Sequence, residues 1–155
     1  MQPLAELLTP ERTACQVPGI SKKRLFETLA RIISEDQLSL SYDEVFSQLI
    51  SREKLGSTGL GEGIAIPHCR IGNCSQPTGT LVTLSEAIDF DSPDNQPVDL
   101  VFALLVPEEA HQQHLDTLAG LARLFSQSDF CDSLRGATDG ATLYRLASQA
   151  QAVHP

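Results

Sequence analysis

Basic residues are scarce in this sequence. Its 155 residues include 11 Lys and Arg against 20 Asp and Glu, which gives a formal net charge of −9. A surface of this charge repels phosphate backbones and anionic lipid headgroups unless its basic residues are clustered. The only cluster, residues 22–24, lies where a helix is expected to begin. Nucleic acid is therefore not expected as a partner.

Long apolar runs and paired cysteines are also missing. No run approaches the roughly 20 apolar residues that a membrane helix requires, and the first residues lack the basic and apolar segments of a signal peptide. We expect no membrane insertion and a cytoplasmic protein. No C-x-x-C pair occurs, so we expect thiols rather than disulfides at all four cysteines, which are Cys15, Cys69, Cys74 and Cys131.

What is present is the composition of an ordinary globular protein. Hydrophobic residues make up 41% of the chain and charged residues 20%, and a chain of this length buries about 70% of the surface that its unfolded form exposes. We find no internal repeat and no linker long enough to divide the chain. We therefore expect a single domain over residues 1–155.

The hydrophobic pattern predicts helices, then strands, then helices, which indicates an α/β domain layered around one sheet. Ser21 can cap a first helix, and Ser41 with Glu44 forms a capping box for a second, so that the two form a hairpin. Helices are expected over 21–35, 41–56, 110–126, 129–135 and 140–151, and strands over 64–66, 79–85 and 98–106.

The segment GIAIPHCR, residues 63–70, places a histidine directly after a proline. Pro67 lacks an N–H and biases Ile66 towards an extended conformation, so it should end a strand and present His68 at the end of the sheet. A neutral imidazole with a pKa near 6.5 is a competent nucleophile for a phosphoryl group. On position alone, a histidine that only bonds a backbone carbonyl is the simpler interpretation.

Two features favour a site at this histidine. His114 begins the apolar stripe of the helix after the most apolar strand, and loops beyond strand ends converge in an α/β sheet, so the two imidazoles can meet. His111, one turn earlier, is expected to contact neither. Arg52 and the loop with Ser57 and Thr58 offer the guanidinium, hydroxyl and amide donors that a phosphoryl group needs.

Other sites fit the sequence less well. The glycines at 56, 59, 61 and 63 match neither a dinucleotide fingerprint nor a phosphate-binding loop of nucleotide enzymes. No G-x-S-x-G motif supports a serine hydrolase. Five residues could bind zinc, but their spacing fits no common ligand pattern, so we rank a metal site below phosphorylation. They are His68, Cys69, Cys74, His111 and His114.

Taken together, SREKLGSTGLGEGIAIPH and FDSPDNQPVDLVFALLVPEEAHQQHLDTLAGLARLF resemble the enzyme IIA domains of the bacterial phosphotransferase system, of the fructose and mannitol class. Within that class they resemble most the nitrogen-regulatory branch. The resemblance implies a mixed β-sheet of about five strands flanked by helices on both sides. TACQV (13–17) and AIDF (87–90) are the candidates for the strands that the pattern leaves out. Cys69 departs from the glycine that is common after the histidine, and we interpret it as a bystander.

The resemblance also implies a function. A phosphoryl group from phosphoenolpyruvate passes through enzyme I and an HPr-like phosphocarrier to the tele nitrogen of His68. His114 and Arg52 then stabilise it, and Ser57, Thr58 and Gly59 border it, with no cofactor and no metal. In the nitrogen-regulatory branch the phosphorylation state signals to regulatory targets such as kinases or potassium transporters. The alternatives are a sugar-transport IIA component that passes the phosphoryl group to a IIB acceptor, and a non-catalytic metal-binding module.

Overall fold

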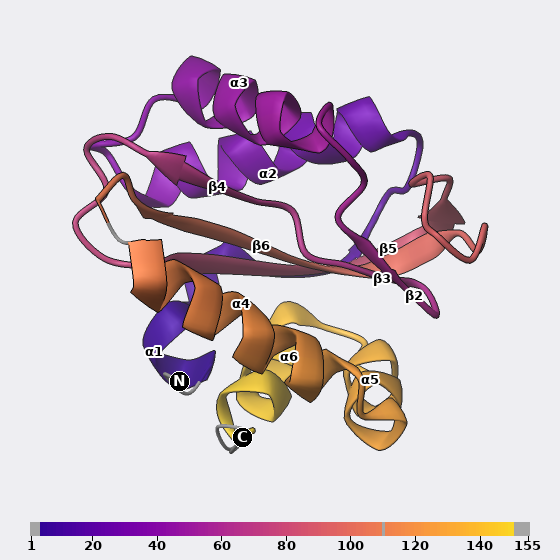
Figure 1. Ribbon diagram of the computed structural model, residues 1–155. Helices are drawn as coiled ribbons and strands as arrows, with labels where there is room; N and C mark the ends of the chain where they lie inside the picture. Colours follow the sequence, from indigo (N-terminus) through magenta and orange to yellow (C-terminus); the bar gives the residue numbers. More distant parts are fainter. Residues whose placement is uncertain (1–3, 110, 151–155) are drawn as a thin grey trace.

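A computed structural model describes residues 4–109 and 111–150 and shows helices on both faces of one mixed sheet (Figure 1). The α/β architecture expected from the sequence is confirmed. The elements in chain order are α1 (Leu4–Leu7), η1 (Pro10–Arg12), β1 (Thr13–Val17), α2 (Lys22–Asp36), α3 (Tyr42–Glu53), β2 (Gly59–Gly61), β3 (Ile64–Ala65), β4 (His68–Ile71), β5 (Thr78–Ile88), β6 (Val98–Pro107), α4 (His111–Phe125), α5 (Ser128–Arg135) and α6 (Gly140–Ser148).

Helices α2 and α3 begin where the sequence predicts. Ser21 Oγ accepts a hydrogen bond from the Arg24 N–H at 3.1 Å, and Ser41 Oγ accepts one from the Glu44 N–H at 3.2 Å, so each satisfies a free amide of the first turn. The two helices pack against each other as the expected hairpin. Their buried apolar residues are Leu25, Phe26, Leu29, Ala30, Ile33, Val45 and Leu49.

The sheet is built around β6, whose first nine residues are all buried except Asp99. Strand β5 pairs with one edge of β6 in the antiparallel direction, and β3 and β4 pair with its other edge in the parallel direction. The complete order is β1-β5-β6-β3-β2, with β4 beside β6 beyond the end of β3. A strand paired on both edges and covered on both faces reads as a continuous apolar run, which explains its sequence.

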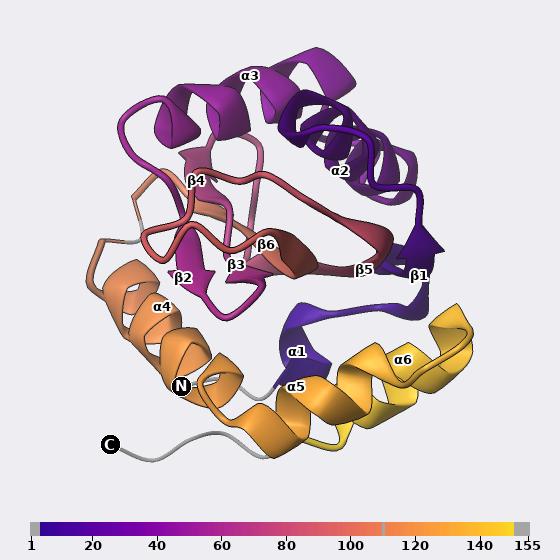
Figure 2. The ribbon, with the colours of Figure 1, turned by 90° about the vertical axis from the view of Figure 1, so that its right-hand side faces the viewer.

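Two apolar layers hold the helices to the sheet. Helices α2 and α3 cover one face, and α1, α4, α5 and α6 cover the other (Figures 1 and 2). Phe26 and Phe90 pack in the first layer, and Phe102 and Phe125 pack in the second with ring centroids 5.7 Å apart. Within the described residues, no helix is long and apolar enough to cross a membrane.

The structure corrects several boundaries. The sheet has six strands rather than about five, and 87–90 is not a separate strand, because Ala87 and Ile88 end β5. The strand at 13–17 is confirmed. The fourth helix begins at His111 within the described residues, since residue 110 lies outside them, and it ends at Phe125. The last helix ends at Ser148, and residue 151 lies outside the described residues.

Candidate active site

A break between two short strands places His68. Strand β3 ends at Ala65 and β4 begins at His68, so the histidine starts a strand instead of following one as the sequence suggested. The register along β6 is the same on both sides of the break, with Ala65 opposite Val101 and His68 opposite Leu104. Pro67 fits here because only its carbonyl is used, accepting from the Leu104 N–H at 2.8 Å.

A backbone hydrogen bond fixes the imidazole of His68. Its Nδ1 lies 2.8 Å from the carbonyl oxygen of Ile66. A carbonyl oxygen can only accept, so the proton is on Nδ1 and the lone pair of the neutral ring is on Nε2. The free lone pair of His68 is therefore on Nε2, the tele nitrogen, as the predicted role of this residue requires.

His114 is the fourth residue of α4, and its imidazole faces that of His68. The two imidazole centroids are 5.5 Å apart and their planes are inclined by 50°. Alternation from β3 into β4 explains the approach, because Ile64 and Ile66 pack in the layer that contains α4, and His68 continues their side of the sheet. The convergence of the two histidines predicted from the sequence is thus present in the structure.

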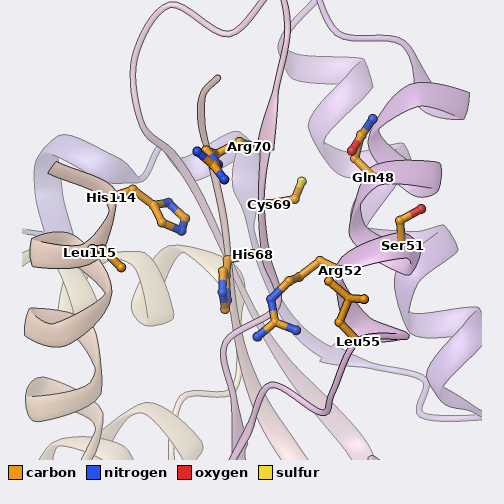
Figure 3. Close-up of a pocket in the computed structure, with 9 residues that line it drawn as sticks. All are labelled: Gln48, Ser51, Arg52, Leu55, His68, Cys69, Arg70, His114 and Leu115. Carbon is orange, nitrogen blue, oxygen red and sulfur yellow. The ribbon is translucent and has the colours of Figure 1, made fainter. Parts of the chain in front are cut away.

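Arg52 and Arg70 line the same pocket, of about 530 Å³ between α3 and α4, to which Gln48 and Ser51 add further polar groups. Figure 3 shows the Arg52 side chain reaching towards His68 from α3, and the Arg70 guanidinium near His114. Arg52 is held by a hydrogen bond from Nη1 to the carbonyl of Gly56 at 2.9 Å. In a protein of net charge −9, two guanidinium groups in one pocket make a local site for an anion.

The loop at 57–59 borders a second pocket of about 320 Å³, which shares Arg52 and His68 with the first. Its polar groups are used within the protein, contrary to the expectation of exposed donors. The Ser57 hydroxyl donates to the Phe90 carbonyl at 2.9 Å, and the Gly59 N–H donates to Ser57 Oγ at 3.1 Å. Thr58 is buried with both its donors on Glu53. Contact of this loop with a phosphoryl group therefore stays a prediction.

The surroundings of both imidazoles favour the neutral form. Burial lowers the pKa of His68 below its ordinary value, and the charge of Arg52 lowers it further, while the bond to Ile66 and the charge of Glu53 oppose this. Burial also lowers the pKa of His114, with contributions from His68, Arg70 and Arg52. Both rings therefore favour the neutral form more than a free histidine does, which keeps the Nε2 lone pair of His68 available.

The arrangement does not favour a metal site. No three His, Cys, Asp or Glu side chains of the described residues are grouped as metal ligands. Cys69 packs with Cys74 in the layer under α2 and α3, on the opposite face of β4 from His68. In Figure 3 its sulfur points away from the imidazole. The prediction that His111 contacts neither histidine concerns a side chain outside the described set.

Residues 6–150 match the model of a protein family described as "Phosphoenolpyruvate-dependent sugar phosphotransferase system, EIIA 2". The chain belongs to the EIIA 2 family. The match covers all the helices and strands from β1 to α6, including His68, His114 and Arg52. This chain is therefore a component of a phosphotransferase system.

Relatives within this family carry a more specific description. "Nitrogen regulatory protein" of Pseudomonas aeruginosa is 43% identical over 148 residues, covering 96% of each chain. The protein of the same description from Escherichia coli is 40% identical and covers 96% of this chain and 91% of its own. The crystal structure of IIA-Ntr from Neisseria meningitidis has a TM-score of 0.86 at 41% identity, covering 93% of this chain and 98% of that one. Mannitol IIA of Escherichia coli, at 17% identity and a TM-score of 0.74, shares the EIIA fold.

Two residues near the EIIA site were not selected from the sequence. Arg70 follows His68 by two positions, and alternation along a strand could have placed both on one face. Glu53 gave no signal, because a glutamate near a helix end usually faces water. Its burial depends on contacts with distant parts of the chain, which a local pattern does not contain.

Cys69 is expected to be chemically inert in the folded protein. Burial raises the pKa of its thiol to about 12, with a further contribution from Cys74. The thiolate fraction at neutral pH is then roughly a thousandfold below that of an ordinary cysteine. A brief treatment with iodoacetamide, followed by peptide mass spectrometry, should label Cys15, which is half-buried, well before Cys69. Labelling of Cys69 at the rate of Cys15 would instead support a redox-sensitive site.

Proposed function

We propose that this protein accepts a phosphoryl group from an HPr-like phosphocarrier onto Nε2 of His68, and that the phosphorylated and unphosphorylated forms bind different regulatory targets. The observation that most directly supports the proposal is the contact of His68 with His114 in a pocket that two arginines line, in a chain of the EIIA 2 family. Each group has a role that its geometry suits.

The proposed transfer needs no proton movement at His68. The Nε2 lone pair forms a bond to phosphorus, and the electron pair of the donor's N–P bond returns to the donor's imidazole. The proton stays on Nδ1, which donates it in a hydrogen bond to the Ile66 carbonyl, and this bond stabilises the positive charge that the ring gains. The guanidinium of Arg52 and an N–H of His114 compensate the negative charge on the phosphoryl oxygens. Because transfer from one histidine to another changes the free energy little, the main task of the protein is to position the phosphoryl group.

A regulatory role is preferred to sugar transport. Relatives at 43% and 42% identity are described as nitrogen regulatory proteins, whereas a fructose-specific EIIA component from Haloferax volcanii is 31% identical. A structural relative at 16% identity, mannitol IIA of Escherichia coli, has been studied in complex with phosphorylated mannitol IIB, so transfer to a IIB acceptor is the second candidate. A phosphoryl group adds about two negative charges to the surface, enough to exchange one partner for another. Kinases and potassium transporters are the proposed targets.

Incubation with phosphoenolpyruvate, enzyme I and an HPr-like carrier of the nitrogen branch should add one acid-labile phosphoryl group, which intact-mass spectrometry would detect. We expect the carrier of the sugar branch to charge the protein more slowly, and a mannitol-type IIB to leave the phosphoryl group in place. The control is a nitrogen regulatory relative charged by the same mixture. No addition under conditions that charge this control would contradict phosphoryl acceptance, and rapid transfer to IIB would favour the transport role.

A further inference from the structure

Glu53 carries a charge in an unfavourable place. It is the last residue of α3, where the helix dipole is negative, and only 8% of its surface is exposed. A buried charge persists in a folded protein only where it is paired and hydrogen-bonded. The contacts of its carboxylate therefore decide what it does.

Both carboxylate oxygens of Glu53 are occupied. The Thr58 hydroxyl donates to Oε1 at 2.6 Å and the Thr58 N–H donates to Oε2 at 3.0 Å. The ammonium group of Lys22 lies 2.9 Å from Oε2, and it also donates to the Phe90 carbonyl at 3.2 Å. Glu53 thus joins the end of α3 to the start of α2 and to the loop that borders the pocket.

An unbroken series of hydrogen bonds leads from this carboxylate to His68. Glu53 holds Thr58 through the N–H and the hydroxyl of that residue. The carbonyl of Thr58 accepts a hydrogen bond from the Ile66 N–H at 3.0 Å. The carbonyl of Ile66 in turn bonds Nδ1 of His68 at 2.8 Å. The backbone position of Ile66, and with it the orientation and tautomer of the imidazole, depends on where Thr58 is held. Arg52 directly precedes Glu53 on α3. The contacts of Glu53 therefore fix the backbone beside Arg52 as well as the backbone that orients His68.

We propose that Glu53 is a positioning residue for phosphoryl acceptance: through Thr58 and Ile66 it holds the His68 ring with its Nδ1–H donating to the Ile66 carbonyl and its Nε2 towards the pocket. The inference rests on the proposed function and goes beyond it, because it assigns a task to a group that does not touch the phosphoryl group. A neutral amide at this position offers one acceptor atom in place of two, so a Glu53→Gln variant leaves one donor of Thr58 or Lys22 without its partner.

The test compares Glu53→Gln with the wild type in two measurements. Nitrogen-15 NMR of the unphosphorylated protein reports the tautomer and the pKa of His68, and rapid-quench assays report the rate of phosphoryl uptake. We expect about a tenfold slower uptake, a mixture of the two tautomers, and a pKa of His68 lower than in the wild type, because the Glu53 charge raises it. Thr58→Val, which keeps the backbone donor and removes the hydroxyl, should slow uptake and mix the tautomers to a smaller degree. Because the Glu53 charge remains in this variant, the pKa of His68 should stay near that of the wild type.

Asp36→Asn is the matched control. Asp36 forms the other well-buried ion pair of the described residues, with Arg12, whose remaining side-chain bonds go to the carbonyls of Leu7 and Gly79. It should lower thermal stability to a similar degree and leave the tautomer and the uptake rate of His68 unchanged.

The outcomes separate this inference from the proposed function. A wild type that takes up no phosphoryl group refutes the function, while the NMR comparison still tests the positioning. If the wild type is phosphorylated and both Glu53→Gln and Thr58→Val match it in uptake rate and in the tautomer of His68, Glu53 does not position His68. A slower Glu53→Gln with an unaltered tautomer, matched by an equally slow Asp36→Asn, would assign Glu53 a purely structural role and also overturn the inference.

Discussion

A His68→Ala variant is expected to take up no phosphoryl group from a donor that charges the wild type fully. Nε2 of His68 is the atom on which the N–P bond forms in the proposed reaction, and alanine offers no replacement nucleophile. Intact-mass spectrometry after incubation with phosphoenolpyruvate, enzyme I and the phosphocarrier should find the unmodified mass. The substitution removes a half-buried side chain from the start of β4, so circular dichroism should find the fold retained.

The other histidines sharpen this test. His114→Ala should still be charged, only more slowly, because His114 is proposed to stabilise the group and not to carry it. His111→Ala serves as the matched control, since its sequence context predicts no contact with the site. Full uptake by His68→Ala would show that another residue is the acceptor, with His114 the first to examine because its ring lies beside that of His68.

Much of the fold followed from local patterns in the sequence. The caps at Ser21 and Ser41 and the apolar run of β6 marked their elements, because caps and periodicity are properties of neighbouring residues. Strand β2 gave no such signal, since Gly-Leu-Gly has neither β-branched residues nor alternation and is a strand only through its pairing with β3. Strand β5 continues beyond Thr83 through exposed residues with a shift in register, which hides the pattern.

The site was predictable where a reactive type of side chain lies at a position that the pattern of strands and helices identifies. His68 and His114 could be placed together because one lies beside the central strand and the other on the helix that follows that strand. The loop at 57–59 was predictable as a neighbour of the site but not as a set of occupied donors, because the partners Glu53 and Phe90 come from tertiary packing. Gly59 illustrates the same limit: a methyl group there would collide with the Ser92 side chain, so the glycine permits a close approach of the 89–97 loop.

Arg52→Ala is expected to slow phosphoryl uptake about a hundredfold at neutral pH while leaving the fold intact. Loss of one preorganised donor to developing charge has an effect of this size, and the side chain is half-buried with one hydrogen bond, to Gly56. Arg52→Lys should recover only part of the rate, because an ammonium group cannot bind two phosphoryl oxygens in a fixed plane. Rapid-quench assays with Arg31→Ala, a solvent-exposed arginine of α2, as the matched control measure both effects.

The pH dependence of Arg52→Ala identifies the mechanism. The charge of Arg52 lowers the pKa of His68, so its removal raises that pKa and leaves more of the imidazole protonated in mildly acidic solution. A protonated ring has no lone pair on Nε2, so the deficit of the variant should grow as the pH falls from 8 towards about 6. A deficit that is constant with pH would assign Arg52 to the phosphoryl oxygens alone. Equal rates for the variant and the wild type throughout this range would remove Arg52 from the site, and binding of the phosphoryl group would then depend on His114 and Arg70.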